Sequence, residues 1–230
     1  LVKNGPVEQL NQTEFTQPAL LTASIALWRL AHEQTVPAID VVAGHSLGEY
    51  SALVAAEVIS FADAAKLVQK RGQFMQTAVP LGEGGMAAIL GLDDEQVIEI
   101  CSIANEDGVV EAVNFNSPGQ VVIAGEKNAV ALACELMKEA GAKRALVLPV
   151  SVPSHCSLMK DAAMEYKYSV DSINFQIGDK KVLHNVDADY SSNVEEIKSK
   201  LVEQLHNPVL WTLMVQKMKY HYTYSVSYIS

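Results

Sequence analysis

The stretch IDVVAGHSLGEYSALVAA, residues 39–56, decides how this chain is expected to fold. Its first part, IDVVAG, is short, apolar and rich in β-branched residues, which predicts a strand buried on both faces. The helical pattern that follows begins with hardly any loop between the two. A buried strand that leads directly into a helix is typical of α/β proteins with a parallel sheet.

Ser46 stands at the corner between this strand and this helix, and two interpretations of it are open. Residues 44–48, GHSLG, match the G-x-S-x-G nucleophile elbow, in which the serine oxygen projects from a sharp turn between glycines. There the N–H of Leu47 and the helix N-terminus point to where a carbonyl oxygen becomes negative. Residues 46–49, SLGE, also fit a capping box, in which the serine starts the helix.

The next predicted helix, which runs from Phe61 to about Val79 after the cap residue Ser60, carries an arginine on its apolar side. Arg71 falls on the stripe of apolar residues that recur at helical spacing. A guanidinium that faces inward must find an anion or lose several kcal/mol through desolvation. Three roles are open: an ion pair with Glu49 or another carboxylate, a long side chain that reaches solvent, or a two-pronged grip on a substrate carboxylate.

A serine nucleophile needs a base, and His155 is the best placed of the six histidines. It follows a predicted strand and precedes a predicted helix, a position typical of catalytic groups carried on loops. A structural role for His155 is equally open on these grounds. We expect the side chain of His45 to leave the elbow in another direction, and Cys156, which lacks an elbow of its own, to pack in the core.

Residues 84–150 follow an order of elements different from that of their surroundings. The turn signal at residues 117–119, SPG, separates two strand-like runs, and each predicted helix lies between strands. The order β-α-β-β-α-β is that of a ferredoxin-like unit. Its predicted elements are GMAAILGL (85–92), DDEQVIEICSIAN (93–105), VEAVNFN (110–116), QVVIAG (120–125), EKNAVALACELMKEAG (126–141) and AKRALVLPV (142–150).

The predicted fold class is therefore α/β: a parallel-sheet, hydrolase-like body with an inserted ferredoxin-like subdomain. The body comprises residues 1–82 and 151–230, and the subdomain residues 83–150. Prolines predict two helix starts in the body, one with Pro18 in the first turn and one with Pro208 at its beginning. Other body helices are predicted at 157–167 and 194–206, and residues 220–230, YHYTYSVSYIS, have the alternation of an edge strand.

Composition excludes some classes of function. The formal net charge of −10 and the isoelectric point near 5.0 argue against a nucleic-acid surface, which needs a basic face. We expect neither a membrane span nor a leader, because the sequence lacks a long apolar run and a basic-then-apolar start. The three cysteines lack metal-ligand spacing and fit a reducing, cytoplasmic setting.

Taken together, these segments resemble the bacterial malonyl-CoA:acyl carrier protein transacylases, which load malonyl groups for fatty-acid synthesis. The resemblance runs from about residue 8 to residue 211 and is most specific in GHSLGEYSALVA and VPSHCSLM. The matching segments are QTEFTQPALLTASIALWR, AGHSLGEYSALVAA, VQKRGQFMQ, the stretch from GMAAILGL to NFNSPGQVVIAG, AKRALVLPVSVPSHCSLM and QLHNPVLW.

The resemblance implies the roles of four residues. Ser46 becomes acylated, His155 is its general base, the N–H of Leu47 forms part of the oxyanion hole, and Arg71 binds the free malonyl carboxylate. The partners implied are malonyl-CoA and acyl carrier protein, and we expect the chain to act as a monomer. No metal or redox cofactor is implied, because CoA and the carrier's phosphopantetheine arm are substrates.

The ends of the chain depart from the family pattern. Family members open with a strand and a Gly-Gln-Gly-Ser-Gln loop that lies before the first residue here, and YHYTYSVSYIS does not match their C-terminal strand and Gly-Pro-Gly turn. We therefore expect this chain to be poorly stable and weakly active or inactive. Two alternatives stay open: a serine hydrolase with the same elbow, and an impaired fragment that binds only CoA or the carrier. Lys66, Lys70 and Lys143 are candidate carrier contacts or simple surface charges.

Overall fold

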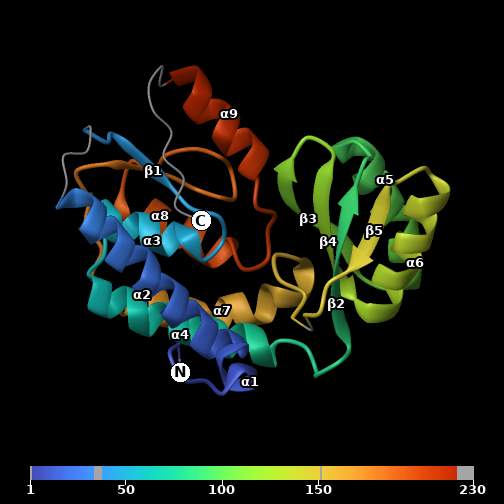
Figure 1. The fold of residues 1–230 in the computed structure, drawn as a ribbon, viewed down its shortest axis with the longest axis horizontal. Coiled ribbons are helices and arrows are strands. Elements are labelled where there is room, and N and C mark those ends of the chain that lie inside the picture. The colour runs from blue at the N-terminus through green and yellow to red at the C-terminus, as the bar shows by residue number, and fades with distance from the viewer. Residues whose placement is uncertain (1, 34–37, 151, 222–230) are drawn as a thin grey trace.

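The computed structural model describes residues 2–33, 38–150 and 152–221 and shows a mixed α/β protein with one parallel and one antiparallel sheet. The parallel sheet pairs β1 (Val41–Ala43) with β6 (Lys181–Leu183). It lies among helices in one half of the molecule, and the antiparallel sheet forms the other half (Figure 1). Within the described ranges, no helix is long and apolar enough to cross a membrane.

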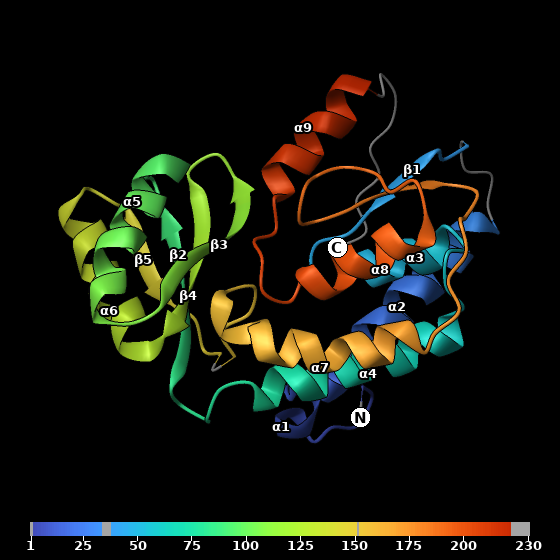
Figure 2. The ribbon, with the colours of Figure 1, turned by 180° about the vertical axis from the view of Figure 1, so that it is seen from behind.

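Helices make up most of the half that contains the parallel sheet. Its core joins α2, α3, α4, α7 and α8 through apolar side chains such as Leu21, Leu53 and Leu67. Seen from behind, α7 lies alongside α4 (Figure 2). The helices of this half are α1 (Val7–Leu10), α2 (Thr13–His32), α3 (Gly48–Ala55), α4 (Phe61–Thr77), α7 (Lys160–Asp171), α8 (Val194–Glu203) and α9 (Trp211–His221), with a 3-10 turn at Ser157–Met159.

The antiparallel half has the element order predicted from the sequence. Its strands lie in the order β3-β4-β2-β5, so the two chain-adjacent strands β3 and β4 form a hairpin. Helices α5 and α6 cover one face and enclose an apolar core that includes Val97, Ile123 and Met137. The elements are β2 (Gly84–Leu90), α5 (Asp94–Ala104), β3 (Val110–Ser117), β4 (Gln120–Glu126), α6 (Lys127–Glu139) and β5 (Arg144–Val147), with a 3-10 turn at Asn105–Asp107.

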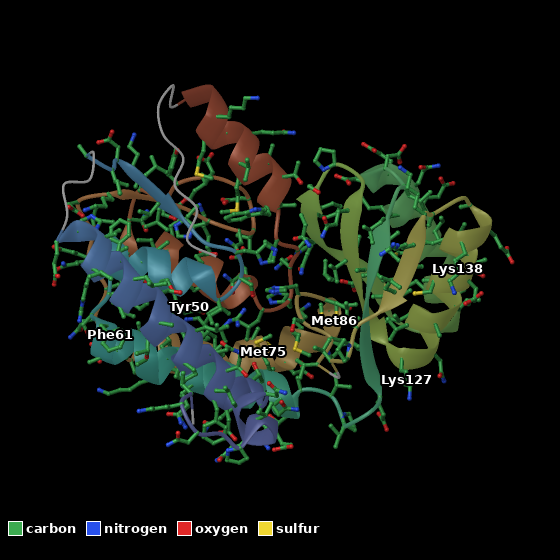
Figure 3. The ribbon with its side chains drawn as sticks, viewed as in Figure 1. Tyr50, Phe61, Met75, Met86, Lys127 and Lys138 are labelled. Atoms are coloured by element: carbon green, nitrogen blue, oxygen red, sulfur yellow. The ribbon has the colours of Figure 1, made fainter. Side chains whose placement is uncertain are left out.

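The face of the antiparallel sheet without helices packs against the other half. Met86 lies on that inner side, whereas Lys127 and Lys138 mark α6 on the outer side (Figure 3). Met86, Val113, Val122 and Ala124 enclose Cys156 in a small buried cluster. Residue 156 follows His155, so this contact ties the sheet to the loop that carries the candidate base.

Several predicted boundaries are wrong, for physical reasons. Pro18 lies inside α2 and not in its first turn, because α2 begins at Thr13. The first turn is held by packing: a Cβ on Gly72 of α4 would meet the backbone of Glu14. Such tertiary contacts override the local preference of proline for a first turn.

The C-terminal helix and the smaller sheet also differ from the prediction. Helix α9 begins at Trp211, so Pro208 precedes it and does not start it. The predicted edge strand begins inside α9, which ends at His221, and its remaining residues, 222–230, lie outside the described residues. Strand β6 was missed because only Lys181–Leu183 pair, which is too short for a recognisable pattern.

Candidate active site

The corner after β1 has the geometry of a nucleophile elbow. Ser46 has a φ of 52°, in the left-handed region that a non-glycine residue rarely adopts. A Cβ on Gly44 would collide with the backbone of Gly48, so residue 44 must be glycine, whereas a Cβ on Gly48 would meet no atom within 4 Å. Only the first flanking glycine is therefore required by close backbone approach. The strained serine conformation is the kind of local cost that active sites retain.

His155 lies within hydrogen-bonding distance of Ser46, although 109 residues separate them in the chain. Ser46 Oγ is 2.8 Å from His155 Nε2, and His155 Nδ1 is 2.6 Å from the carbonyl oxygen of Gln204. Because a carbonyl oxygen only accepts, Nδ1 carries the proton and Nε2 is left to accept from the serine hydroxyl. This is the tautomer that a general base needs.

Burial keeps this imidazole neutral. His155 is 2% exposed, and desolvation, together with the nearby Arg71 guanidinium, lowers its pKa to about 3. The bond to Gln204 acts in the opposite direction but does not offset the burial. The imidazole is therefore neutral in the resting protein, and its Nε2 is available as an acceptor beside Ser46 Oγ.

Arg71 reaches the same serine from α4. Its Nη2 donates to Ser46 Oγ at 3.1 Å and to Gln204 Oε1 at 2.8 Å, and its Nη1 donates to Gln17 Oε1 at 2.9 Å. The guanidinium carbon lies 5.6 Å from the centre of the Tyr50 ring, within cation–π range. The side chain is only 2% exposed.

The partners of Arg71 are neutral. No salt bridge found among the described residues includes it, and Nε has no hydrogen-bond partner in that part of the chain. The ion pair with Glu49 that the sequence left open is therefore not formed. A buried guanidinium with an unused N–H donor can bind an anion.

Glu49 and Asn185 fix the backbone of the elbow from behind. Asn185 Oδ1 accepts from the N–H of Ser46 at 2.6 Å, and Asn185 Nδ2 donates to the carbonyl of Gly44 at 2.8 Å. The fully buried Glu49 accepts from the N–H of Asn185 at 3.2 Å and lies 2.7 Å from His184 Nδ1. The capping-box interpretation of residues 46–49 is wrong: the cap position is Leu47, and it makes no side-chain cap bond.

Comparisons with known proteins show the family of this chain. The family model described as "Acyl transferase domain" matches residues 1–226. A malonyl CoA-acyl carrier protein transacylase of Escherichia coli (strain K12) is 56% identical over 218 residues, which are 95% of this chain and 71% of that protein. The chain belongs to the malonyl CoA-acyl carrier protein transacylase family.

Solved structures of transacylases share the fold. An acyl carrier protein S-malonyltransferase from Vibrio cholerae, at 55% identity, superposes with a TM-score of 0.93 over 96% of this chain and 72% of its own. A malonyl-transacylase in complex with its type II PKS acyl-carrier protein, at 52% identity, gives 0.94 over 96% and 71%. This likeness supports the mixed α/β arrangement described above.

The structure brings together the four residues to which the resemblance assigned roles. Ser46, His155 and Arg71 meet at one hydroxyl group, and Leu47 follows the serine at the start of α3. Among the hydrogen bonds of the described residues, none is donated by the N–H of Leu47, so that donor is free next to the nucleophile. Within those residues, no group of three or more His, Cys, Asp or Glu side chains could hold a metal ion.

Two neighbours of the site residues lie as predicted. His45 leaves the elbow in another direction: its Nε2 is 2.8 Å from Asn116 Oδ1 at the end of β3, and its ring meets the edge of Trp211. The thiol of Cys156 is fully buried and donates to the carbonyl of Pro153 at 3.1 Å, and burial raises its pKa to about 12. A protonated, enclosed thiol is a packing group and not a nucleophile.

Sequence reasoning missed the roles of five polar residues around the candidate site. Two are amides that bind Arg71, and three lie behind the elbow. Residues 182–185, VLHN, form an apolar run followed by two polar residues, the usual signal of a functional strand end, but β6 was not recognised. Of the five, the sequence singled out only Glu49, as a cap residue or an ion-pair partner of Arg71. The five residues are Gln17, Glu49, His184, Asn185 and Gln204, all buried.

Proposed function

We propose that this chain transfers a malonyl group from malonyl-CoA to the phosphopantetheine thiol of acyl carrier protein, through a malonyl ester on Ser46, in fatty-acid biosynthesis. The observation that carries the proposal is the convergence of two groups on Ser46 Oγ: His155 Nε2 at 2.8 Å and Arg71 Nη2 at 3.1 Å. A base activates the hydroxyl, and a buried cation beside it selects an acyl group with its own carboxylate.

In the first half-reaction Ser46 displaces CoA. The hydroxyl proton moves to His155 Nε2 as Oγ forms a bond to the thioester carbonyl carbon, and the carbonyl oxygen becomes negative. The free N–H of Leu47 and the N-terminus of α3 stabilise that charge. The intermediate then collapses, the carbon–sulfur bond breaks, and the CoA sulfur takes the proton from His155.

Arg71 binds the far end of the malonyl group. Its unpartnered Nε supplies one donor for the distal carboxylate. The bound negative charge also offsets the guanidinium charge that helps to lower the pKa of His155, so the base becomes stronger when the correct substrate is in place. A group such as acetyl, without a carboxylate, lacks both effects.

The second half-reaction repeats these steps with another thiol. The phosphopantetheine thiol of the carrier gives its proton to His155, attacks the ester carbonyl carbon, and releases Ser46, which recovers its proton from the imidazole. The chemistry needs no metal or redox cofactor, because CoA and the carrier's arm are substrates. All the residues with assigned roles belong to one chain, which supports a monomer as the working unit.

We also propose a division of the chain into two units. Residues 83–150 form a ferredoxin-like subdomain, supported by the order of its elements and by an apolar core of its own. Residues 1–82 and 151–230 form a hydrolase-like acyltransferase body, which in the described part is supported by the core shared by α2, α3, α4, α7 and α8. Three buried cysteines without disulfide bonds support a cytoplasmic setting.

Intact-protein mass spectrometry after mixing with malonyl-CoA tests this function. The expected result is one malonyl adduct, located on Ser46 by peptide mapping, that is absent in Ser46→Ala and disappears when carrier protein with its phosphopantetheine arm is added. Transfer of the adduct to water and not to the carrier would favour a serine hydrolase. No adduct on Ser46 would refute the proposal.

A further inference from the structure

Glu49 is a buried carboxylate with no part in the reaction steps described above. It lies in the first turn of α3 and is fully buried, which for an acidic residue requires good hydrogen-bond partners. Its oxygens lie close to three groups that can donate: His184 Nδ1 at 2.7 Å, the N–H of Asn185 at 3.2 Å and Gln204 Nε2 at 2.8 Å. The carboxylate is therefore held in place from three directions.

The side-chain amide of Gln204 lies between this carboxylate and Arg71. Gln204 Nε2 donates to Glu49 Oε2 at 2.8 Å, while Gln204 Oε1 accepts from Arg71 Nη2 at 2.8 Å. Because a carboxylate only accepts and a guanidinium only donates, the amide can satisfy both neighbours in one orientation only. Its dipole then has the positive end toward the anion and the negative end toward the cation.

This arrangement stabilises the positive charge of Arg71 and leaves one of its N–H donors without a partner among the described residues. A carboxylate in direct contact would take the donors that a substrate needs and would neutralise the guanidinium. With Gln204 in between, Glu49 orients the acceptor that Arg71 requires, while Arg71 Nε has no partner among the described residues. The same amide also donates to the carbonyl of Ser46 at 2.9 Å, which links the elbow to the group.

We propose that Glu49 is a positioning residue for acyl selection: through the Gln204 amide it holds Arg71 ready for acyl groups that carry a free carboxylate. The inference rests on the proposed function, since it concerns the same site. A positioning role for Glu49 predicts different effects on malonyl and acetyl transfer, whereas a merely structural role predicts equal effects on both. Loss of Glu49 disturbs the guanidinium, on which a malonyl group depends and an acetyl group does not.

The test compares initial rates of Ser46 acylation by malonyl-CoA and by acetyl-CoA on one preparation, followed by intact-protein mass spectrometry. The ratio of the two rates does not depend on how much of the sample is folded. In Glu49→Gln the malonyl-to-acetyl ratio falls about tenfold, the size expected for a weakened hydrogen bond to a charged group. If Glu49→Gln does not fold, Glu49→Asp, which withdraws the carboxylate from Gln204 by one methylene, gives a fall in the same direction.

A double-mutant cycle shows whether the effect passes through Gln204. Gln204→Met keeps the backbone carbonyl that binds His155 but lacks the amide, so adding Glu49→Gln to it lowers the ratio no further. Glu196→Gln makes the same chemical change at a partly exposed carboxylate of α8 that pairs with Lys200. It leaves the ratio unchanged and serves as the matched control.

Two results would overturn the inference. One is an equal fall of the malonyl and acetyl rates in Glu49→Gln. The other is a double variant whose malonyl-to-acetyl ratio falls by the product of the two single-variant fold-changes. If the unaltered chain forms no malonyl ester on Ser46, the proposed function itself fails. If it forms the ester and Glu49→Gln keeps the ratio, only the role of Glu49 is wrong.

Discussion

The two halves of the molecule are built from different kinds of interior. In the antiparallel half the core between the sheet and helices α5 and α6 is made of apolar side chains and buried thiols such as Ile123, Met137 and Cys134. In the other half, polar side chains are buried around Ser46. All the polar or charged residues found buried in the described part of the chain lie in that half: Gln17, Glu49, Arg71, His155, His184, Asn185 and Gln204 near the elbow, and Lys200, which pairs with Asp187 and Glu196.

The apolar core of one half stabilises the fold, whereas the buried polar groups of the other half hold the side chains of the candidate site. Apolar burial is non-directional and stabilises a shape, whereas buried polar groups cost free energy unless each has a partner in good geometry. A cluster of such groups, including one donor of Arg71 without a partner, is retained where function requires it.

The halves meet at β3, where the N–H of Phe115 donates to the carbonyl of Val209 at 3.0 Å and Asn116 binds His45.

The strongest test of this contrast is removal of the base. His155→Ala lowers the rate of Ser46 acylation by malonyl-CoA by about 10³-fold, because nothing then accepts the serine proton. Stopped reactions analysed by mass spectrometry measure this rate. Cys156→Ser is the neighbouring control: it keeps a donor for the carbonyl of Pro153 and retains the rate. A fall of less than tenfold in His155→Ala would mean that another group acts as the base.

Replacement of the buried cation changes which acyl group is accepted. Arg71→Ala lowers the acylation rate with malonyl-CoA by about 100-fold relative to acetyl-CoA, the size of a lost charge-assisted bond to the carboxylate. Competition between the two thioesters for Ser46, read by the mass of the adduct, measures the preference. An unchanged preference would show that the guanidinium is a structural group.

A large-to-small change in the apolar half affects stability and leaves selectivity intact. Ile123 is fully buried, and Ile123→Ala lowers the free energy of unfolding by about 2–5 kcal/mol through lost burial and a cavity. Urea unfolding measures the loss. The malonyl-to-acetyl ratio of the remaining folded protein stays at the value of the unaltered chain. A shift of that ratio would break the proposed separation between the halves.

The pH dependence of acylation gives the smallest expected change. Because burial lowers the pKa of His155 to about 3, the base of the free protein stays unprotonated above that value. The second-order rate with malonyl-CoA is therefore nearly constant between pH 7 and pH 5. If His155 had the ordinary histidine pKa near 6.5, this rate would fall about 25-fold over the same range. An acid limb with a midpoint near 6.5 would show that His155 is accessible to solvent.

The sequence predicts the parts of this molecule that local patterns determine. The elbow was predicted because strand, turn and helix follow one another within residues 39–56, and the antiparallel half because its helices and strands show clear periods. Arg71 was found because an arginine on an apolar stripe is a local anomaly. Ser46 and His155 could be named but not placed together, since 109 residues separate them.

Long-range contacts explain what could not be predicted. Gln204 binds Ser46 across 158 residues, and Asn185 binds Gly44 across 141, so nothing near either amide in the sequence announces its partner. Glu49 fits a cap in its four-residue context, yet its partners are His184 and Asn185 directly after β6 and Gln204 at the end of α8. The two proline errors have the same origin, because packing against distant segments sets the helix ends.

The structure of this chain after reaction with malonyl-CoA tests the central claim most directly. The account predicts an ester bond at Ser46 Oγ and a free malonyl carboxylate within hydrogen-bonding distance, about 3 Å, of Arg71 nitrogen atoms. A malonyl group whose carboxylate points to solvent, with no contact between that carboxylate and Arg71, would contradict it.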